Sequence, residues 1–209
     1  MDDSYKISET LFQSKSHVQV LSVLADVDTV MSVSQIARRS GLTRRAVETV
    51  LNRLEKADIV LVTRSGNARV FQLNRDNVFA RNVVLPLFDL EIGLQKLMAE
   101  DIKKALGPLA SSIIMFGSFA RQDHSSTSDV DIVVVTNEER GLRNLDGVVE
   151  QTLTEYSSAF RKKFGHSLEA LIYDQEQAAQ LKDRAPALFE EIRQDGFLIA
   201  GSVDWIDHE

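Results

Sequence analysis

The chain has 209 residues, enough for one or two domains, and 44% of them are hydrophobic. It contains no cysteine, which excludes disulfides and thiolate metal sites. No stretch approaches the roughly 20 apolar residues of a membrane span. The acidic start Met1-Asp2-Asp3 lacks the pattern of an export signal, so we expect a cytoplasmic protein with no membrane partner.

The charges are unevenly distributed along the chain. The 24 basic and 31 acidic residues give a formal net charge of −7, which by itself argues against nucleic-acid binding. Residues 30–75, however, hold nine basic and three acidic residues, a net of +6, whereas residues 76–209 hold a net of −10. A basic segment is thus joined to an acidic body, and the total charge does not exclude nucleic acid.

The basic segment begins with helical patterns. An apolar stripe predicts a helix over 11–24, followed by a turn around 26–29. A short helix capped by Ser32 or Ser34 comes next and ends at Gly41. Thr43 is placed to cap a second helix over 44–57, with Val47, Val50, Leu51 and Leu54 on its apolar face. Two helices joined by a turn that contains glycine form a helix-turn-helix pattern.

A predicted hairpin follows these helices. Residues 59–64 and 69–73 are β-prone, and the turn-forming residues 65–68 separate them. Together with the two helices, this order resembles the winged helix-turn-helix family, which implies DNA binding.

Four arginines are the candidate DNA contacts. Arg44 and Arg45 lie at the N-terminal end of the predicted recognition helix, where side chains reach a major groove. Arg64 and Arg69 flank the predicted wing tip, where they can meet phosphates. The alternative is that these arginines form a solvated face and that the module serves dimerisation or domain docking.

Residues 77–107 are expected to connect two modules. A helix is predicted from near Pro86, a residue tolerated in a first helical turn, to just before Gly107-Pro108. Its apolar stripe is typical of core packing or of a homodimer seam.

The acidic body holds two carboxylates at the start of a predicted strand. A buried strand over 112–116 ends in Gly117-Ser118, and after ten residues Asp129-Val130-Asp131 opens the apolar run 132–135. Residues two apart in a strand face the same side, so Asp129 and Asp131 present their carboxylates together. Hard divalent cations such as Mg²⁺ bind such oxygen pairs and bridge to phosphates.

The segment GSFARQDHSSTSDVDIVVV resembles the nucleotidyltransferase superfamily that includes DNA polymerase beta, and especially its minimal nucleotidyltransferases. The resemblance covers roughly residues 108–201. It implies that Gly117 and Ser118 hold a nucleoside triphosphate, and that Asp129 and Asp131 bind two Mg²⁺ ions with a third carboxylate on a neighbouring strand.

Glu169 is our candidate for that third carboxylate. It lies within the β-prone run 167–173, after a predicted helix over 145–164, although the family commonly has aspartate there. Asp174, at the end of the same run, is the competing candidate. Arg121 is either a phosphate contact or a surface residue, and Gln122 stands where the family often has glycine.

These patterns predict an α+β protein with an N-terminal winged helix-turn-helix (1–76), a connecting helix (77–107) and a nucleotidyltransferase-like mixed sheet flanked by helices (108–209). The resemblance implies transfer of a nucleoside monophosphate, AMP from ATP being the first choice, to a hydroxyl acceptor. Small family members often act as antitoxins that adenylylate a HEPN-type toxin. The alternative is a DNA-binding transcriptional regulator whose inactive transferase-like domain senses a nucleotide.

Overall fold

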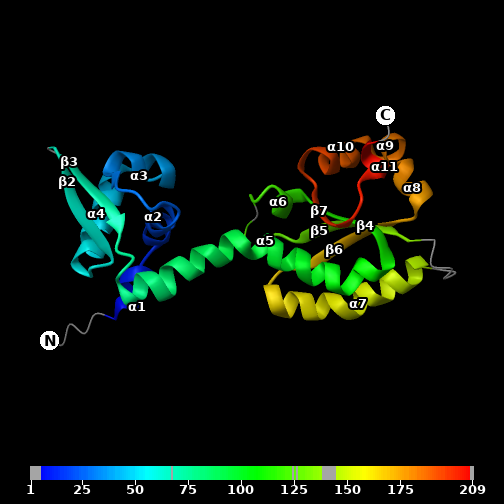
Figure 1. Ribbon diagram of the computed structural model, residues 1–209, viewed down its shortest axis with the longest axis horizontal. Coiled ribbons are helices and arrows are strands. Elements are labelled where there is room, and N and C mark those ends of the chain that lie inside the picture. The colour runs from blue at the N-terminus through cyan, green and yellow to red at the C-terminus, as the bar shows by residue number, and fades with distance from the viewer. Residues whose placement is uncertain (1–5, 67, 124, 126, 138–144, 208–209) are drawn as a thin grey trace. The chain divides into compact units, whose positions relative to one another are not determined.

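The computed structural model describes residues 6–66, 68–123, 125, 127–137 and 145–207 (Figure 1). The chain divides into two compact units, Met1–Ile92 and Gly93–Glu209. The boundary falls inside the long helix α5 (Leu85–Leu106), in the segment that the sequence assigns to the connector. Within the described residues, no helix is both long enough and apolar enough to span a membrane.

The first unit contains the helix-turn-helix and hairpin that the sequence predicts. Its elements are α1 (Ile7–Leu11), α2 (Lys15–Ala25), β1 (Met31–Ser32), α3 (Val33–Ser40), α4 (Arg44–Lys56), β2 (Val60–Ser65), β3 (Ala68–Leu73) and the π-helical segment η1 (Ala80–Val84). The three strands form an antiparallel sheet in the order β1-β3-β2. The winged-helix fold of this segment is therefore confirmed, while Asn67 of the predicted turn lies outside the described residues.

The ends of α3 and α4 follow the capping rules. Ser32, rather than Ser34, caps α3 through a capping box with Gln35. Gly41 takes a left-handed φ of 71° after α3, and the Thr43 hydroxyl accepts a hydrogen bond from the Ala46 amide at the start of α4.

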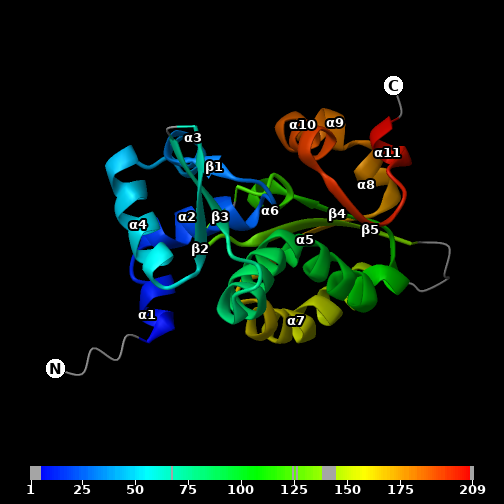
Figure 2. The same ribbon diagram turned by 60° about the vertical axis from the view of Figure 1, so that its left-hand side comes forward.

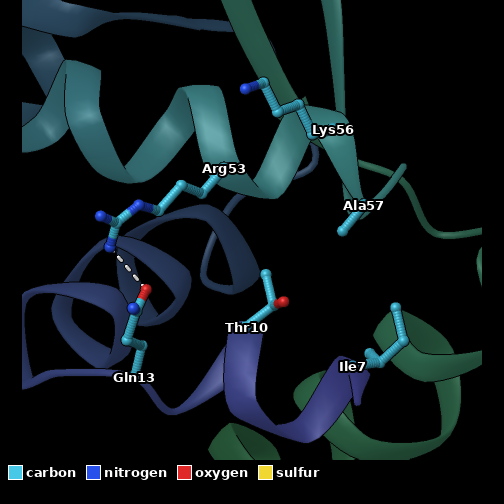
Figure 3. A pocket seen from close by; sticks show the side chains of 6 residues that line it. All are labelled: Ile7, Thr10, Gln13, Arg53, Lys56 and Ala57. Atoms are coloured by element: carbon cyan, nitrogen blue, oxygen red, sulfur yellow. Dashed lines mark hydrogen bonds between the residues drawn. The ribbon is translucent and has the colours of Figure 1, made fainter. Parts of the chain in front are cut away.

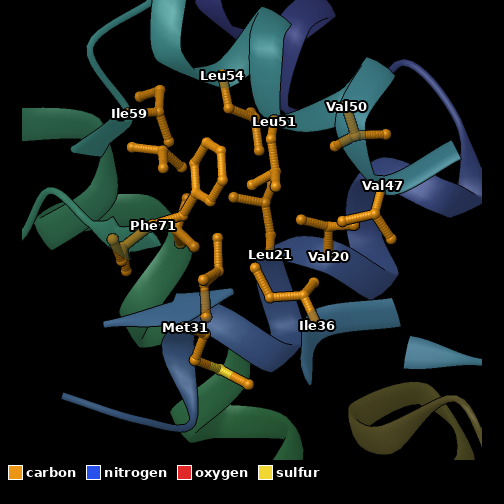
Figure 4. Close-up of a cluster of buried hydrophobic side chains, with 14 of the residues drawn as sticks. Val20, Leu21, Met31, Ile36, Val47, Val50, Leu51, Leu54, Ile59 and Phe71 are labelled. Carbon is orange, nitrogen blue, oxygen red and sulfur yellow. The ribbon is translucent and has the colours of Figure 1, made fainter. Parts of the chain in front are cut away.

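One core holds this unit together (Figure 4). The apolar face of α4 packs against α2, the sheet residue Phe71 and the β1 residue Met31. The four residues expected on that face, Val47, Val50, Leu51 and Leu54, are all buried. This packing fixes α4 and the hairpin as one body.

In this part of the chain, one predicted helix is wrong and two elements were not predicted. The helix predicted over 11–24 is broken, because Ser14 is extended and two helices flank the break. Strand β1 was not predicted, since two residues form it only by pairing Met31 with the distant Phe71. The connecting helix α5 begins at Leu85, next to Pro86, but the π-helical turn η1 directly before it was also missed.

The second unit is a mixed four-stranded sheet with helices on both faces. Its strands are β4 (Ala110–Phe116), β5 (Val130–Thr136), β6 (Leu168–Tyr173) and β7 (Phe197–Gly201), in the order β6-β5-β4-β7. Strand β5 pairs with β6 in parallel, and the other pairs are antiparallel. The α+β fold class expected from the sequence is thus confirmed.

Helices α5 and α7 (Leu145–Phe164) cover one face of this sheet (Figures 1 and 2). The other face carries α8 (Gln175–Ala179), α9 (Leu181–Arg184), α10 (Pro186–Asp195) and α11 (Asp204–Asp207). Alternate residues of β5 divide between the two cores: Val130, Ile132 and Val134 face α5 and α7, and Val133 and Val135 face the opposite layer.

Gly117 and Ser118 are not in a loop, as expected, but begin the short helix α6 (Gly117–Ala120). The helix turns the chain sharply at the end of β4, and the Gly117 carbonyl accepts a hydrogen bond from the Arg121 amide at 3.2 Å.

Candidate active site

The strand register brings two of the predicted acidic residues, Asp131 and Glu169, opposite one another, whereas Asp129 is exposed directly before β5. Asp131 on β5 lies opposite Phe116, the last residue of β4, and opposite Glu169 on β6. Asp131 shares its face of the sheet with Val133, which belongs to the layer of α8 to α10. Glu169 shares its face with Tyr173, which packs against the same layer. The two carboxylates therefore stand on one face of neighbouring strands.

Gly117 lies against the Asp131 carboxylate. A Cβ atom at position 117 would stand 2.7 Å from Asp131 Oδ2, closer than such contacts allow, and the φ of Gly117 is +72°. Glycine is therefore required here both by the backbone conformation and by the neighbouring carboxylate. Ser118 follows with a partly exposed side chain, so Ser118 and the half-buried Asp131 form one surface beside the buried Gly117.

The electrostatics of this surface favour a cation. Burial raises the pKa of Asp131 above its ordinary value, and the charges of Glu169, Asp129 and Glu191 raise it further. Carboxylate oxygens are the donors that Mg²⁺ prefers, so the chemistry of the residues fits the implied metal. Among the described residues, no three His, Asp or Glu side chains already form a metal-binding group.

Asp174 is not part of this surface. It lies beyond Tyr173, whose register partner is Val135 near the far end of β5. Its carboxylate accepts a hydrogen bond from the Gln177 amide at 2.7 Å and caps α8 in a capping box. Asp174 thus has a structural role, whereas Glu169 is exposed beside Asp131.

Arg121 lies among acidic side chains at the end of α6. Its Nη1 is 2.8 Å from Glu191 Oε1 and 3.8 Å from Asp195 Oδ2, both on α10, and its Nε is 3.3 Å from Asp123 Oδ2. Hydrogen bonds to Glu191 and Asp123 raise the pKa of Arg121. Glu191 was missed in the sequence, where no motif separates it from the neighbouring acids.

Gln122 has a left-handed φ of 59°, a conformation that glycine adopts without strain, in keeping with the glycine that the resemblance implies at this position. Its side chain donates a hydrogen bond to Gln95 Oε1 at 3.3 Å, and the buried Gln95 side chain donates to the Phe119 carbonyl at 3.0 Å. The chain after α6 is thus attached to α5.

The four arginines of the first unit differ in their surroundings. Arg44 and Arg45 are exposed at the start of α4, and Arg64 is exposed on β2 directly opposite Arg69 on β3. Arg69, however, points back toward α4, where it hydrogen-bonds Glu55 and Asn52. Its guanidinium also lies 5.1 Å from the ring centroid of Phe71. The structure therefore attaches Arg69 to the body of its own unit.

The same unit also has a pocket of about 450 Å³ between α1 and the C-terminal end of α4 (Figure 3). Arg53 and Lys56 line it, and Arg53 Nη1 donates a hydrogen bond to Gln13 Oε1 at 2.5 Å. None of the site residues expected from the sequence lines this pocket.

Comparison with known proteins agrees with the two-part geometry. Residues 94–191 match the model of the nucleotidyltransferase domain, and residues 14–69 match the model of the MarR family. The chain joins a MarR-family winged helix to a nucleotidyltransferase domain. The matched transferase region contains Gly117, Asp131 and Glu169, and it ends at Glu191.

Six solved chains are similar to part of this chain, among them the following three. The winged helix-turn-helix domain of Mb0332 from Mycobacterium bovis, a possible ArsR-family regulator, has 21% identity, covering 47% of this chain and 80% of its own, with a TM-score of 0.32. A toxin-antitoxin structure with AMP-PNP has 18% identity, coverages of 56% and 77%, and a TM-score of 0.34. A nucleotidyltransferase structure from Sulfolobus solfataricus has 22% identity, coverages of 53% and 82%, and a TM-score of 0.28.

No curated protein sequence matches the chain.

Proposed function

We propose that the protein is a Mg²⁺-dependent nucleotidyltransferase that moves a nucleoside monophosphate, AMP from ATP in the first instance, to a hydroxyl acceptor. The observation that carries this proposal is the packing of the Asp131 carboxylate against Gly117, with Glu169 opposite on β6. This arrangement places cation ligands next to a backbone that a phosphate can approach closely.

In this proposal Asp129, Asp131 and Glu169 hold two Mg²⁺ ions. When bound, the ions supply charge neutralisation of the triphosphate and lower the pKa of the acceptor hydroxyl. The Gly117 backbone and the Ser118 hydroxyl bind phosphate oxygens. Glu169 accepts the proton of the hydroxyl as its oxygen attacks the α-phosphorus, and pyrophosphate leaves with the electrons of the broken bond.

The proposed acceptor is a tyrosine of a HEPN-type partner protein, as the resemblance to minimal nucleotidyltransferases implies. Asp129 and Glu169 are both exposed, so the acceptor side of the site is open to a macromolecule. A buried pair would instead favour a small acceptor that the protein encloses.

The first unit is proposed to bind DNA. The exposed Arg44 and Arg45 at the start of α4 and the exposed Arg64 on the wing support this role, together with the net charge of +6 over residues 30–75. Arg69 is the weakest of the four proposed contacts, because Glu55 already holds its guanidinium.

The second candidate function is a DNA-binding regulator that senses a nucleotide without chemistry. The observation in its favour is that the guanidinium of Arg121, our candidate phosphate contact, already forms an ion pair with Glu191.

Labelled nucleotide distinguishes these functions. We expect ATP labelled at the α-phosphate, with Mg²⁺ and cell lysate, to label a protein acceptor, whereas ATP labelled at the γ-phosphate does not. Asp131→Asn should abolish the label, and the exposed control Asp183→Asn should retain it. Magnesium-dependent binding of α,β-methylene-ATP without any label transfer would instead establish the regulator.

A further inference from the structure

Arg121 is the positively charged side chain that the structure places between α6 and the acidic end of α10. The charges nearest to its guanidinium are Glu191 at 2.8 Å, Asp123 at 3.3 Å and Asp195 at 3.8 Å. A triphosphate that approaches Gly117 and Ser118 therefore meets an arginine that is already paired.

The carboxylates on α10 stand on a helix that packs against the sheet. Glu191 and Asp195 are four residues apart and so lie on one face of the helix. The end of α10 is packed tightly on β4, since a Cβ atom at Gly196 would stand 2.9 Å from Ile114 Cγ2. Arg121 follows the short helix α6 and carries its charge on a longer side chain, which is 36% exposed, compared with 38% for Glu191 and 39% for Asp195.

The charge of Glu191 also reaches the centre of the candidate site. It is one of the carboxylates that raise the pKa of Asp131, after burial, Glu169 and Asp129. Glu191 therefore lies close enough to affect both the arginine and Asp131.

We propose that Glu191 is a positioning residue that holds Arg121 in a nucleotide-free position, and that the guanidinium moves from Glu191 to the triphosphate when the nucleotide binds. This inference rests on the proposed function, because it assumes a triphosphate at Gly117 and Ser118. No covalent bond changes in the exchange: one set of charge-assisted hydrogen bonds replaces another.

The size of the effect follows from the exposure of the pair. Exposed ion pairs are weak, so Glu191 holds Arg121 only slightly against a triphosphate. The apparent dissociation constant equals the intrinsic constant divided by the fraction of molecules in which the arginine is free. Removing Glu191 should therefore tighten triphosphate binding by about two- to five-fold.

The test is a double-mutant cycle on the full chain, with α,β-methylene-ATP and inorganic tripolyphosphate as probes, each with Mg²⁺, measured by calorimetry. We expect Glu191→Gln to tighten binding of both probes, and to have a smaller effect in an Arg121→Gln background, where only its charge near Asp131 is removed. Glu191→Asp keeps the charge but withdraws the carboxylate, so it should also tighten binding. The control is Glu190→Gln, because Glu190 pairs with Arg193 instead; this variant should bind as the wild type does.

The other outcomes overturn the inference in separable ways. Equal tightening by Glu191→Gln with and without Arg121 would show a general charge effect, as would a Glu191→Asp variant that binds like the wild type. Unchanged or weaker binding by Glu191→Gln would show that Glu191 does not compete for Arg121. Failure of the folded wild-type protein to bind either probe would overturn the proposed function as well.

Discussion

Asp131 is the residue at which the stability and the proposed function of the second unit conflict. Its carboxylate is partly buried, faces other carboxylates and lies against Gly117 instead of a cationic side chain. Such a group destabilises a metal-free fold, and acids with a pKa perturbed by burial and by neighbouring charges are typical of functional sites. A hydrophobic or amide side chain at position 131 would make the metal-free fold more stable.

Asp131→Asn should therefore raise the melting temperature of the protein in EDTA. The folded pKa of Asp131 lies above its unfolded value, so its stabilising contribution is present in acid and is lost as the pH rises through the folded pKa. The gain from Asp131→Asn should grow from pH 4 to pH 7, as measured by thermal denaturation. A gain that is the same at both pH values would contradict this account, and Asp183→Asn serves as the control.

Position 122 offers a second test at single residues. A left-handed conformation costs a residue other than glycine about 1 to 2 kcal/mol, and Gln122 has a φ of 59°. Both Gln122→Gly and Gln122→Ala lose the hydrogen bond to Gln95. The difference between their free energies of unfolding therefore reports the backbone strain. We expect the glycine variant to be more stable by about 1 kcal/mol in urea unfolding.

The control for this order of stability is the exposed Gln151, inside α7. Helical backbone favours alanine over glycine by about 1 kcal/mol, so the two substitutions should rank in the opposite order there. If the glycine and alanine variants rank in the same order at both positions, backbone strain at Gln122 does not cause their difference in stability.

The residues of the candidate active site could be predicted only in part from the sequence. Gly117, Asp129, Asp131 and Glu169 stand in strands or at strand ends, where alternation indicates which residues share a face. The contact between Arg121 and Glu191 joins residues 70 apart in sequence, and no local pattern indicates it. The distinction between Glu169 and Asp174 likewise depends on register and on the capping of α8.

At the scale of elements, the edge strand β7 depends on a glycine. Gly201 pairs with Ser112 on β4 with a φ of +80°, and a Cβ atom there would stand 1.8 Å from the Ser111 carbonyl oxygen. Gly165, between α7 and β6, has the same φ of +80°. A Cβ atom at Gly165, however, would have no neighbouring atom within 4 Å. The two positions differ in steric contact and not in φ.

This pair predicts unequal costs for one substitution. Gly165→Ala should cost about 1 to 2 kcal/mol, from backbone conformation alone. Gly201→Ala should cost at least about 3 kcal/mol, because β7 must also separate from β4 to relieve the clash. Chemical denaturation of both variants measures the difference, and equal costs would show that β7 adjusts without losing its pairing.

The elements that the sequence predicted well have strong internal patterns. The range of α7 agrees with the sequence prediction, and α4 carries its expected apolar face and its cap at Thr43. The break between α1 and α2, the strand β1 and the π-helical η1 were missed because tertiary contacts decide them. Short elements have too few residues to show a period of their own.

At the scale of the whole molecule, the uneven charge separates two proposed roles. Residues 30–75 carry a net charge of +6 and form most of the winged helix, whereas residues 76–209 carry −10 and include the candidate active site. The total of −7 describes neither part. DNA affinity should therefore depend on where a positive charge lies, and not on how many the chain has.

Two double variants that remove the same charge test this point. Arg44→Ala/Arg45→Ala alters the exposed start of α4, and Arg161→Ala/Lys162→Ala alters exposed residues of α7 in the acidic body. If Arg44 and Arg45 contact phosphates, the first variant should weaken DNA binding and reduce the slope of log K against log salt by about 2. The second variant should leave both the affinity and the slope unchanged in gel-retardation titrations. Equal weakening by both variants would mean that total charge governs binding, because the two substitutions change that total identically.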